Sequence, residues 1–364
     1  MNDQLAVELP RRTEVAQAFK QDGGMVAAVL PIHYPRALLR AFGILPMEVW
    51  GPPNVDPGVG TAHVQAYVCS VVRNALSFLH SDTAKVADLI LVPHACDSLQ
   101  GLGSLLLDFV QPEQPVIPLY LPRSNKAQGI QFLAKEFRSI YDRLEEITQR
   151  SPSDSELMTN IRREEAADVL LAQLHSERRC LDISDYDFYR MIRSREFLPA
   201  EGFIDLAEKL RSRMGGKRER AIGVMLSGIV PEPMETLESI TEFGGMVVAD
   251  DLACTGRRLY PPGESEDPFR RMAERILHGP PDWSLGRSIQ SRIDHMREKI
   301  RSTDAQGVIF YSVKFCEPEL FDLPSLRNEL DRSGIPSMTM EIDLNDPLSD
   351  QALMRLETFF EMIA

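Results

Sequence analysis

Short apolar runs alternate with amphipathic stretches in the first and last thirds of the chain, and this alternation limits the fold more than any other feature. The apolar runs cover residues 25–30, 44–50, 89–96, 115–119, 221–226, 246–250, 308–316 and 337–341. Runs this short, separated by helical patterns, are typical of a parallel sheet with helices on its faces. We therefore predict an α/β protein.

The middle of the chain breaks the pattern. Residues 127–213 contain no strand-like run and predict three or four helices, and Ser153 followed by Glu156 has the form of a helix capping box. A length of 364 residues suggests about two domains at a typical ~150 residues each. We predict an N-terminal α/β lobe over residues 1–126, a helical insertion and linker over 127–215, and a C-terminal α/β lobe over 216–364. Met214-Gly215-Gly216 marks the linker at the last boundary.

Charge and hydropathy exclude several classes of protein. Forty basic and 54 acidic residues give a formal net charge of −14, whereas nucleic acids and anionic membrane surfaces attract clustered positive charge. No run approaches the ~18 apolar residues of a membrane span. The first residues show no basic segment followed by an apolar core, so a signal peptide is not expected. We predict a cytoplasmic protein that binds neither nucleic acid nor membranes.

Five widely spaced cysteines are the main candidates for chemistry. In a reducing compartment, such cysteines are ligands, catalytic thiols or buried thiols rather than disulfides. Cys96 and Cys316 each end an apolar run, and open α/β sheets carry their sites at the C-terminal ends of strands, so the two could meet in one cleft. A single free cysteine can equally be a small apolar side chain that fills a corner of the core. Cys69 falls within a helix predicted over His63–His80.

Several familiar sites are not indicated. No C-x-x-C pair and no ferredoxin-type spacing occurs, so cysteine spacing by itself predicts neither a zinc ribbon nor a cluster. The chain has no G-x-x-x-x-G-K-[ST] loop for nucleotide phosphates. Cys96 and His94 could in principle form a nucleophile and base, but two residues apart on a loop they have no fixed hydrogen bond and no third orienting group.

Several short motifs carry a resemblance to a known family. They are Tyr67–Ser70 with Arg73, Leu91–Asp97, Asp250–Arg257, Val313–Pro318, Leu320–Asp322, and Gly334–Pro336 before a strand containing Glu341. In this order, they resemble the cluster-bearing subunits of 2-hydroxyacyl-CoA dehydratases and ATP-dependent benzoyl-CoA reductases. The resemblance extends from about Pro46 to the end of the chain.

This resemblance implies a structure and a cofactor. The fold would be two Rossmann- or flavodoxin-like parallel-sheet lobes with a helical insertion between them. A [4Fe-4S] cluster would lie between the lobes, held by Cys69, Cys96 and Cys316, with the fourth iron open to a thioester oxygen. The implied partners are an acyl-CoA substrate, a related second cluster subunit, and a separate ATP-dependent activator that supplies the electron.

The resemblance leaves the reaction open between two chemistries. In dehydratases, one-electron reduction of the thioester leads to loss of the 2-hydroxyl group, and in reductases electrons enter an aromatic ring; one fold can serve both. A non-catalytic subunit that only relays electrons is a further alternative. A cluster-free α/β binding protein with buried thiols is another.

The first apolar run is followed by a departure from the family pattern. Relatives often carry a carboxylate-rich segment there, whereas this chain has His33-Tyr34-Pro35-Arg36. His33 or Tyr34 could replace the missing acid–base group, since both can move protons at a strand end. Packing on the next helix is the alternative role for these two residues.

Arg257 and Arg258 are candidates for binding an anion such as a CoA phosphate. Cys254 lies just before them and also follows an apolar run, which makes it the rival of Cys316 as a cluster ligand. Cys180 falls in the helical insertion and is expected to have no role.

Overall fold

A computed structural model describes residues 8–53, 55–56, 58–212, 214–215 and 221–364. The N-terminal residues in which no signal peptide was expected, 1–7, lie outside the described residues. The same holds for Gly216 at the end of the predicted linker.

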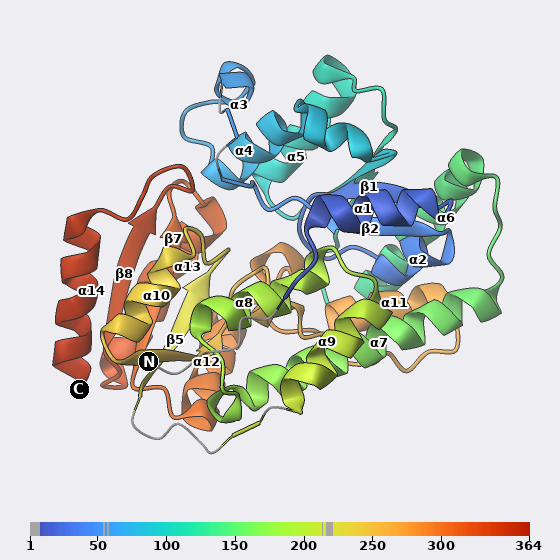
Figure 1. Ribbon diagram of the computed structural model, residues 1–364. Helices are drawn as coiled ribbons and strands as arrows, with labels where there is room; N and C mark the ends of the chain where they lie inside the picture. The colour runs from blue at the N-terminus through green and yellow to red at the C-terminus, as the bar shows by residue number, and fades with distance from the viewer. Residues whose placement is uncertain (1–7, 54, 57, 213, 216–220) are drawn as a thin grey trace.

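Two four-stranded parallel sheets form the framework of the described chain (Figure 1). The N-terminal sheet has the order β2-β1-β3-β4 and the C-terminal sheet the order β6-β5-β7-β8, so the two sheets share one plan. The strands are β1 (Met25–Val29), β2 (Ile44–Glu48), β3 (Leu89–Pro93), β4 (Val116–Leu119), β5 (Ile222–Gly228), β6 (Gly245–Asp250), β7 (Gly307–Val313) and β8 (Ser337–Ile342). The predicted α/β fold of two parallel-sheet lobes is confirmed.

Helices connect the strands and fill the middle of the chain. They are α1 (Arg12–Gln21), α2 (Arg36–Ala41), α3 (Gly58–His63), α4 (Ser70–Leu79), α5 (Asp97–Leu105), α6 (Ala127–Thr148), α7 (Asp154–Ser176), α8 (Asp185–Arg193), α9 (Ala200–Arg211), α10 (Glu235–Glu242), α11 (Pro268–Leu277), α12 (Ile289–Thr303), α13 (Glu317–Arg332) and α14 (Asp350–Ile363). The four helices α6 to α9 lie where the sequence predicts a strandless insertion, and Ser153 and Glu156 form the predicted capping box at the start of α7.

Side chains on the N-terminal sheet alternate between two cores. Ala27 and Val29 of β1 belong to a core shared with α2, α6 and α11, whereas Val26 and Ala28 face a second core. The buried positions of α6 recur every three or four residues, as a helix packed on a sheet requires. Because both faces of the sheet are covered, its strands read as continuous apolar runs.

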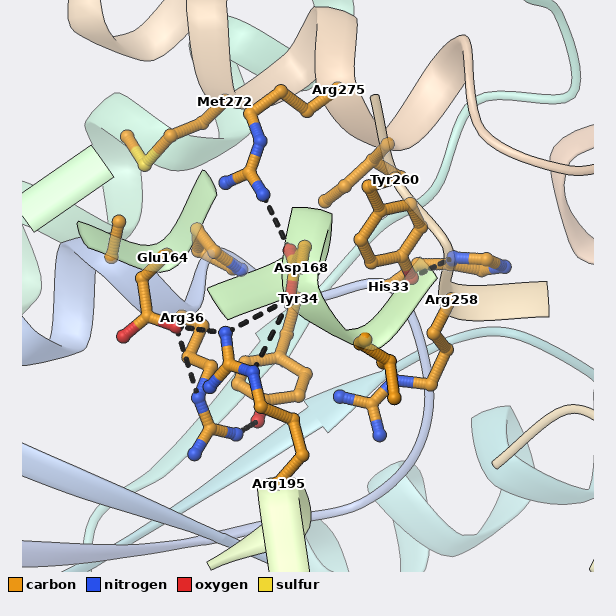
Figure 2. A pocket seen from close by; sticks show the side chains of 14 residues that line it. His33, Tyr34, Arg36, Glu164, Asp168, Arg195, Arg258, Tyr260, Met272 and Arg275 are labelled. Carbon is orange, nitrogen blue, oxygen red and sulfur yellow. Dashed lines mark hydrogen bonds and ion pairs between the residues drawn. The ribbon is translucent and has the colours of Figure 1, made fainter. Parts of the chain in front are cut away.

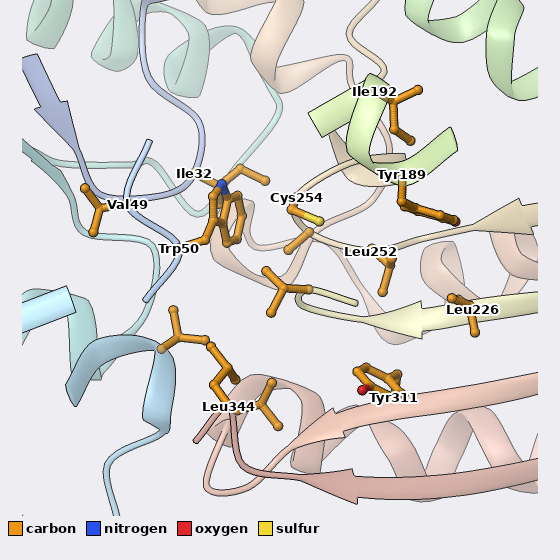
Figure 3. Close-up of a cluster of buried hydrophobic side chains, with 14 of the residues drawn as sticks. Ile32, Val49, Trp50, Tyr189, Ile192, Leu226, Leu252, Cys254, Tyr311 and Leu344 are labelled. Carbon is orange, nitrogen blue, oxygen red and sulfur yellow. The ribbon is translucent and has the colours of Figure 1, made fainter. Parts of the chain in front are cut away.

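The second core continues from one lobe into the other. It contains Val26 and Val92 of the N-terminal sheet together with Leu226 and Tyr311 of the C-terminal sheet. Figure 3 shows part of this cluster, with Trp50 beside the loop that carries Cys254. The inner faces of the two sheets therefore share one apolar cluster, and the loops at the ends of their strands meet over it.

Helix boundaries differ from the predictions at two places. The single helix predicted over His63–His80 is wrong, because α3 ends at His63 and α4 begins at Ser70. The apolar residues at 64 and 68 have helical spacing but lie in the turn between the two helices. Helix α11 was not predicted; it packs on α6 and α7 of the insertion although it lies in the C-terminal third of the chain. In the described residues, no helix is long and apolar enough to cross a membrane.

Gly51 gives a test of how tightly the loop after β2 is packed. Its φ is +67°, and a Cβ there would lie 2.4 Å from the carbonyl oxygen of Val71 in α4. We predict that Gly51→Ala lowers the free energy of unfolding by at least about 2 kcal/mol more than Gly244→Ala. Gly244 is the matched control, because its φ is +80° but no atom lies within 4 Å of the added Cβ. Equal losses in urea unfolding would show that the contact with Val71 relaxes freely.

Candidate functional site

Three cysteines occupy the same structural position in three different segments. Cys69, Cys96 and Cys316 are the N-cap residues of α4, α5 and α13, each with an extended backbone. Cys96 follows β3 and Cys316 follows β7, two strands whose C-terminal ends point toward the junction of the lobes. The first N–H groups of a helix favour negative charge, so each helix end offsets part of the cost of a thiolate at its cysteine.

The three cysteines line one cavity of about 80 Å³ between the lobes. Its remaining wall is mostly apolar, with a polar patch on one side. The lining residues are Pro31, Ile32, Trp50, Val71, Val72, Ala95, Leu99, Ile229, Ala253, Arg257, Asp282, Trp283, Ser284, Pro318 and Glu319. The structure thus brings together the three cysteines that were predicted as a set.

The thiols are close enough to oppose one another's ionisation. Burial raises the pKa of Cys96 to about 12, and the charge of Cys69 adds to this effect. Burial also raises the pKa of Cys316 well above its usual value, with further contributions from Cys69 and Cys96. Three thiolates in this cavity therefore need a cationic group among them.

Thiol groups are the donors that this cavity offers to a cofactor. Within the described residues, no three His, Cys, Asp or Glu side chains are placed to share one metal ion. A cubane spreads its ligands further, with thiolate sulfurs about 6–7 Å apart if the Fe–S bonds are about 2.3 Å long. Two buried thiols and the partly exposed thiol of Cys96, all facing one mostly apolar cavity, match the ligand type that Fe–S clusters use.

Buried ion pairs form the polar side of the cavity. Arg257 Nη1 donates to Glu319 Oε1 at 2.7 Å and lies 3.4 Å from Asp282 Oδ2. Arg292 Nη2 donates to Glu319 Oε2 at 2.8 Å. Burial alone would raise the pKa of Glu319, but the charges of Arg257 and Arg292 outweigh it and lower the pKa to about 2. The predicted CoA ligand Arg257 therefore faces the cysteine cavity and is 3% exposed.

His33 connects the cysteine cavity with a second cavity (Figure 2). Its Nε2 lies 3.4 Å from Asp282 Oδ1, on the cysteine side. Its Nδ1 lies 2.8 Å from the hydroxyl of Tyr260, which lines the second cavity. Burial would raise the pKa of Asp282, but His33 and Arg257 hold it well below its usual range. Asp282 is therefore a carboxylate that both neighbours stabilise.

Tyr34, the other predicted acid–base residue, belongs to a separate network around Glu48. The Tyr34 hydroxyl donates to Glu48 Oε1 at 2.7 Å. Arg258 Nη1 donates to Glu48 Oε2 at 2.7 Å, and the indole of Trp50 donates to the same oxygen at 2.9 Å. Arg36 Nη1 completes the set at 3.3 Å from Oε1. Both terminal nitrogens of Arg258 contact Glu48. Arg258 was predicted to bind the substrate, but in this structure its guanidinium group connects the two lobes.

The two remaining cysteines lie elsewhere. Cys254 is buried in the apolar cluster of Figure 3, and its neighbour Ala253, not Cys254 itself, lines the cysteine cavity. Cys180 ends a short 3₁₀ turn in the insertion, where its carbonyl accepts a bond from Gly215. The structure therefore groups Cys316, rather than Cys254, with Cys69 and Cys96.

Sequence reasoning missed the acidic residues of the site. Glu48, Asp282 and Glu319 were not singled out, although all three side chains are buried. Glu48 alone gave a usable signal, since it lies within an apolar run and an unpaired charge is unfavourable in a core. Asp282 and Glu319 were not marked by the sequence, because their basic partners lie between 25 and 249 residues away.

Comparison with known proteins places these features in context. A family described as "2-hydroxyglutaryl-CoA dehydratase, D-component" matches residues 31–363. The chain is 24% identical to the (R)-phenyllactyl-CoA dehydratase beta subunit of Clostridium sporogenes, across 98% of this chain and 96% of that one. It is 23% identical to the (R)-2-hydroxyglutaryl-CoA dehydratase subunit beta of Acidaminococcus fermentans, across 95% and 94%.

A subunit of a reductase is about as similar to this chain as the dehydratase subunits are. One of the subunits of benzoyl-CoA reductase from Thauera aromatica is 23% identical across 90% of this chain and 89% of its own. These matches confirm the family resemblance predicted from the motifs. They also confirm the expected kind of enzyme, a subunit of the dehydratase type with the benzoyl-CoA reductase type as the alternative.

The ion pairs of Glu319 predict a pH-dependent contribution to stability. A folded pKa of about 2 against an ordinary value of 4.5 corresponds to about 3 kcal/mol at neutral pH. Because the folded pKa is depressed, this contribution is present above pH 4.5 and is lost as the pH falls toward 2. We predict that Glu319→Gln destabilises the protein at pH 7 and that its difference from wild type shrinks below pH 4.5.

Urea unfolding at several pH values measures this difference. Glu238→Gln, at an exposed position of α10, is the control and should leave the unfolding curve unchanged. A difference between Glu319→Gln and wild type that stays constant down to the acid limit of the folded state would contradict the assignment.

Proposed function

Since the chain belongs to the family described as 2-hydroxyglutaryl-CoA dehydratase, D-component, we propose that it is the iron–sulfur subunit of an acyl-CoA-processing enzyme, with 2-hydroxyacyl-CoA dehydration as its reaction. The observation that carries this proposal is the cavity that Cys69, Cys96 and Cys316 share. Relatives named as dehydratase subunits for phenyllactyl-, lactoyl- and 2-hydroxyglutaryl-CoA support the choice of reaction.

The proposed cofactor is a [4Fe-4S] cluster held by these three cysteines. When bound, such a cluster supplies electron transfer, and an iron without a protein thiolate supplies a contact for a thioester oxygen. The chain itself excludes water from most of the cavity with apolar side chains such as Ile32, Trp50 and Leu99. It places the N-termini of three helices against the thiolates, which offsets part of their mutual repulsion.

Arg257 and His33 are the residues that we assign to the substrate. Arg257 lines the cavity, and its Nε has no hydrogen-bond partner among the described residues, so it can donate to an oxygen of the acyl group. A hydroxyl group leaves as water only after it receives a proton. We propose that His33 holds such a proton and that the Asp282 carboxylate, 3.4 Å away, orients its imidazole toward the cavity. Tyr34 and Arg258 hold Glu48 in place on the other side of the His33 loop, and a substrate role for them stays a prediction.

An open groove beside the cysteines offers an approach for substrate and partners. It has a volume of about 800 Å³ and is lined by residues that flank the three cysteines, such as Val68, Asp97 and Phe315. Tyr67 and Phe321 on its wall are 64% and 67% exposed. We propose that the thioester enters here and that the exposed aromatic residues are covered by a related second subunit. The electron would come from a separate ATP-dependent activator.

A second candidate function has one specific observation in its favour. The similarity to the benzoyl-CoA reductase relative is almost as high as that to the dehydratase subunits, so reduction of an aromatic acyl-CoA is the alternative reaction. A subunit that only relays electrons differs from both in one property. Acyl-CoA would change the electron paramagnetic resonance signal of a catalytic subunit's own cluster and leave that of a relay unchanged.

Iron and sulfide analysis tests the cofactor directly. Protein purified without oxygen should contain about four irons and four acid-labile sulfides per chain. Serine in place of Cys69, Cys96 or Cys316 should remove the iron, because each change deletes one of three ligands. Cys180→Ser and Cys254→Ser are the matched controls and should retain it. Iron-free wild type without absorbance near 400 nm, or loss of iron only in Cys254→Ser, would refute the assignment.

Because a separate activator is proposed to use the ATP, we predict that this chain alone does not hydrolyse ATP. Its sequence has no lysine-containing phosphate-binding loop of the form G-x-x-x-x-G-K-[ST]. Phosphate release should therefore equal that of a buffer blank until an activator protein is added. ATP hydrolysis activity that copurifies with the chain through several columns would overturn the prediction.

A further inference from the structure

The second cavity, on the far side of His33 from the cysteines, has features that the proposed function does not use. It is an enclosed space of about 40 Å³ at the meeting point of the N-terminal lobe, the insertion and the C-terminal segment (Figure 2). Four of its lining residues are arginines and two are acids: Arg36, Arg195, Arg258, Arg275, Glu164 and Asp168. Four guanidinium groups in the wall of one buried space are unusual, because each of these groups stays charged in a protein.

The contacts around the cavity can be followed pair by pair. Glu164 contacts Arg195 and lies 3.3 Å from Arg36. Asp168 contacts Arg195 at 3.0 Å and Arg275 at 2.5 Å. Arg258 is paired with Glu48, which Arg36 shares. Four guanidinium groups therefore face three carboxylates.

Neighbouring acids do not supply the missing negative charge. Glu165 lies 3.7 Å from Arg275 but is bound by both Nε and Nη2 of Arg271, each at 2.9 Å. Glu196, which is also buried nearby, is held by Arg12 and Arg193. One positive charge remains in excess among the described residues around this cavity.

Unpaired donors accompany the excess charge. Arg195 Nη1 is buried without a hydrogen-bond partner among the described residues. Arg36 Nε and Arg275 Nε also form no hydrogen bond there, although they lie 3.3 Å from Glu164 and 3.7 Å from Glu165. The three side chains are 4%, 8% and 7% exposed. An unpaired buried cation and unmet donors each carry a large free-energy penalty. Water could satisfy the donors, but it would leave the charge unbalanced.

We propose that this cavity binds one small carboxylate-class oxyanion, of the size of formate or bicarbonate, as the missing partner of Arg195 and its neighbours. The volume corresponds to about three water molecules at ~10–15 Å³ each, which admits formate and excludes a longer acyl chain. A planar oxyanion presents two oxygens to a guanidinium fork, a geometry that a spherical chloride ion lacks. The proposal rests on the arginines and carboxylates of this cavity and not on the cofactor proposed above.

Equilibrium dialysis of the full-length protein against radiolabelled formate, in chloride buffer of constant ionic strength, tests the proposal. The wild type should bind one formate per chain with saturation, and bicarbonate should displace it. Arg195→Gln removes the excess charge and an unpaired donor, so it should weaken binding at least about tenfold. Glu164→Gln raises the excess charge and should tighten binding.

Arg301→Gln is the control, since its side chain is 79% exposed and carries the same charge; it should bind formate as the wild type does. Absence of saturable formate binding in the wild type would overturn the proposal, and so would a wild-type affinity in both cavity variants. Displacement by chloride at equal concentration would overturn the preference for an oxyanion. If Arg195→Gln fails to fold, the opposite shift expected for Glu164→Gln still decides the question.

Discussion

The carboxylate of Glu48 is the interaction on which the arrangement of the two lobes depends. It ends β2 and is buried, and it accepts hydrogen bonds from four side chains. Arg258 reaches it from the C-terminal lobe, 210 residues away in the sequence. Removal of one partner of a buried ion pair leaves the other uncompensated, at a cost of about 3–5 kcal/mol. The lobes are therefore held in one relative position rather than free to slide.

This fixed position matters because the site is assembled from both lobes. Cys69 and Cys96 belong to the N-terminal lobe and Cys316 to the C-terminal lobe, and the indole of Trp50 connects Glu48 with the cavity that they line. Further contacts between the lobes lie close by, such as the ion pair of Arg73 and Asp343 at 2.7 Å. A small shift of one lobe would separate Cys316 from the other two cysteines.

The buried charges form a continuous layer behind the site rather than scattered pairs. Arg257, Glu319 and Asp282 make one wall of the cysteine cavity, and His33 links this wall to Tyr260 and the arginine-lined cavity. Such a layer is costly to bury unless each member is paired. The proposed anion would balance the excess charge at the arginine-lined cavity and pair with Arg195 Nη1. Apolar side chains, by contrast, occupy most of the cysteine cavity's wall, which keeps its local dielectric constant low.

The sequence by itself determined the fold class, and the family resemblance of its motifs singled out the three cysteines that line the cavity. Strands buried on both faces must be apolar throughout, so β3 and β7 were visible as runs ending near Cys96 and Cys316. It also indicated the strandless insertion and the capping box at Ser153. Only the tertiary structure decided which charges pair, as with Glu48 and Arg258 or Arg257 and Glu319. Pairing between side chains 62 or 210 residues apart leaves no periodic trace in the chain, because it depends on how the strand-end loops meet and not on local backbone preference.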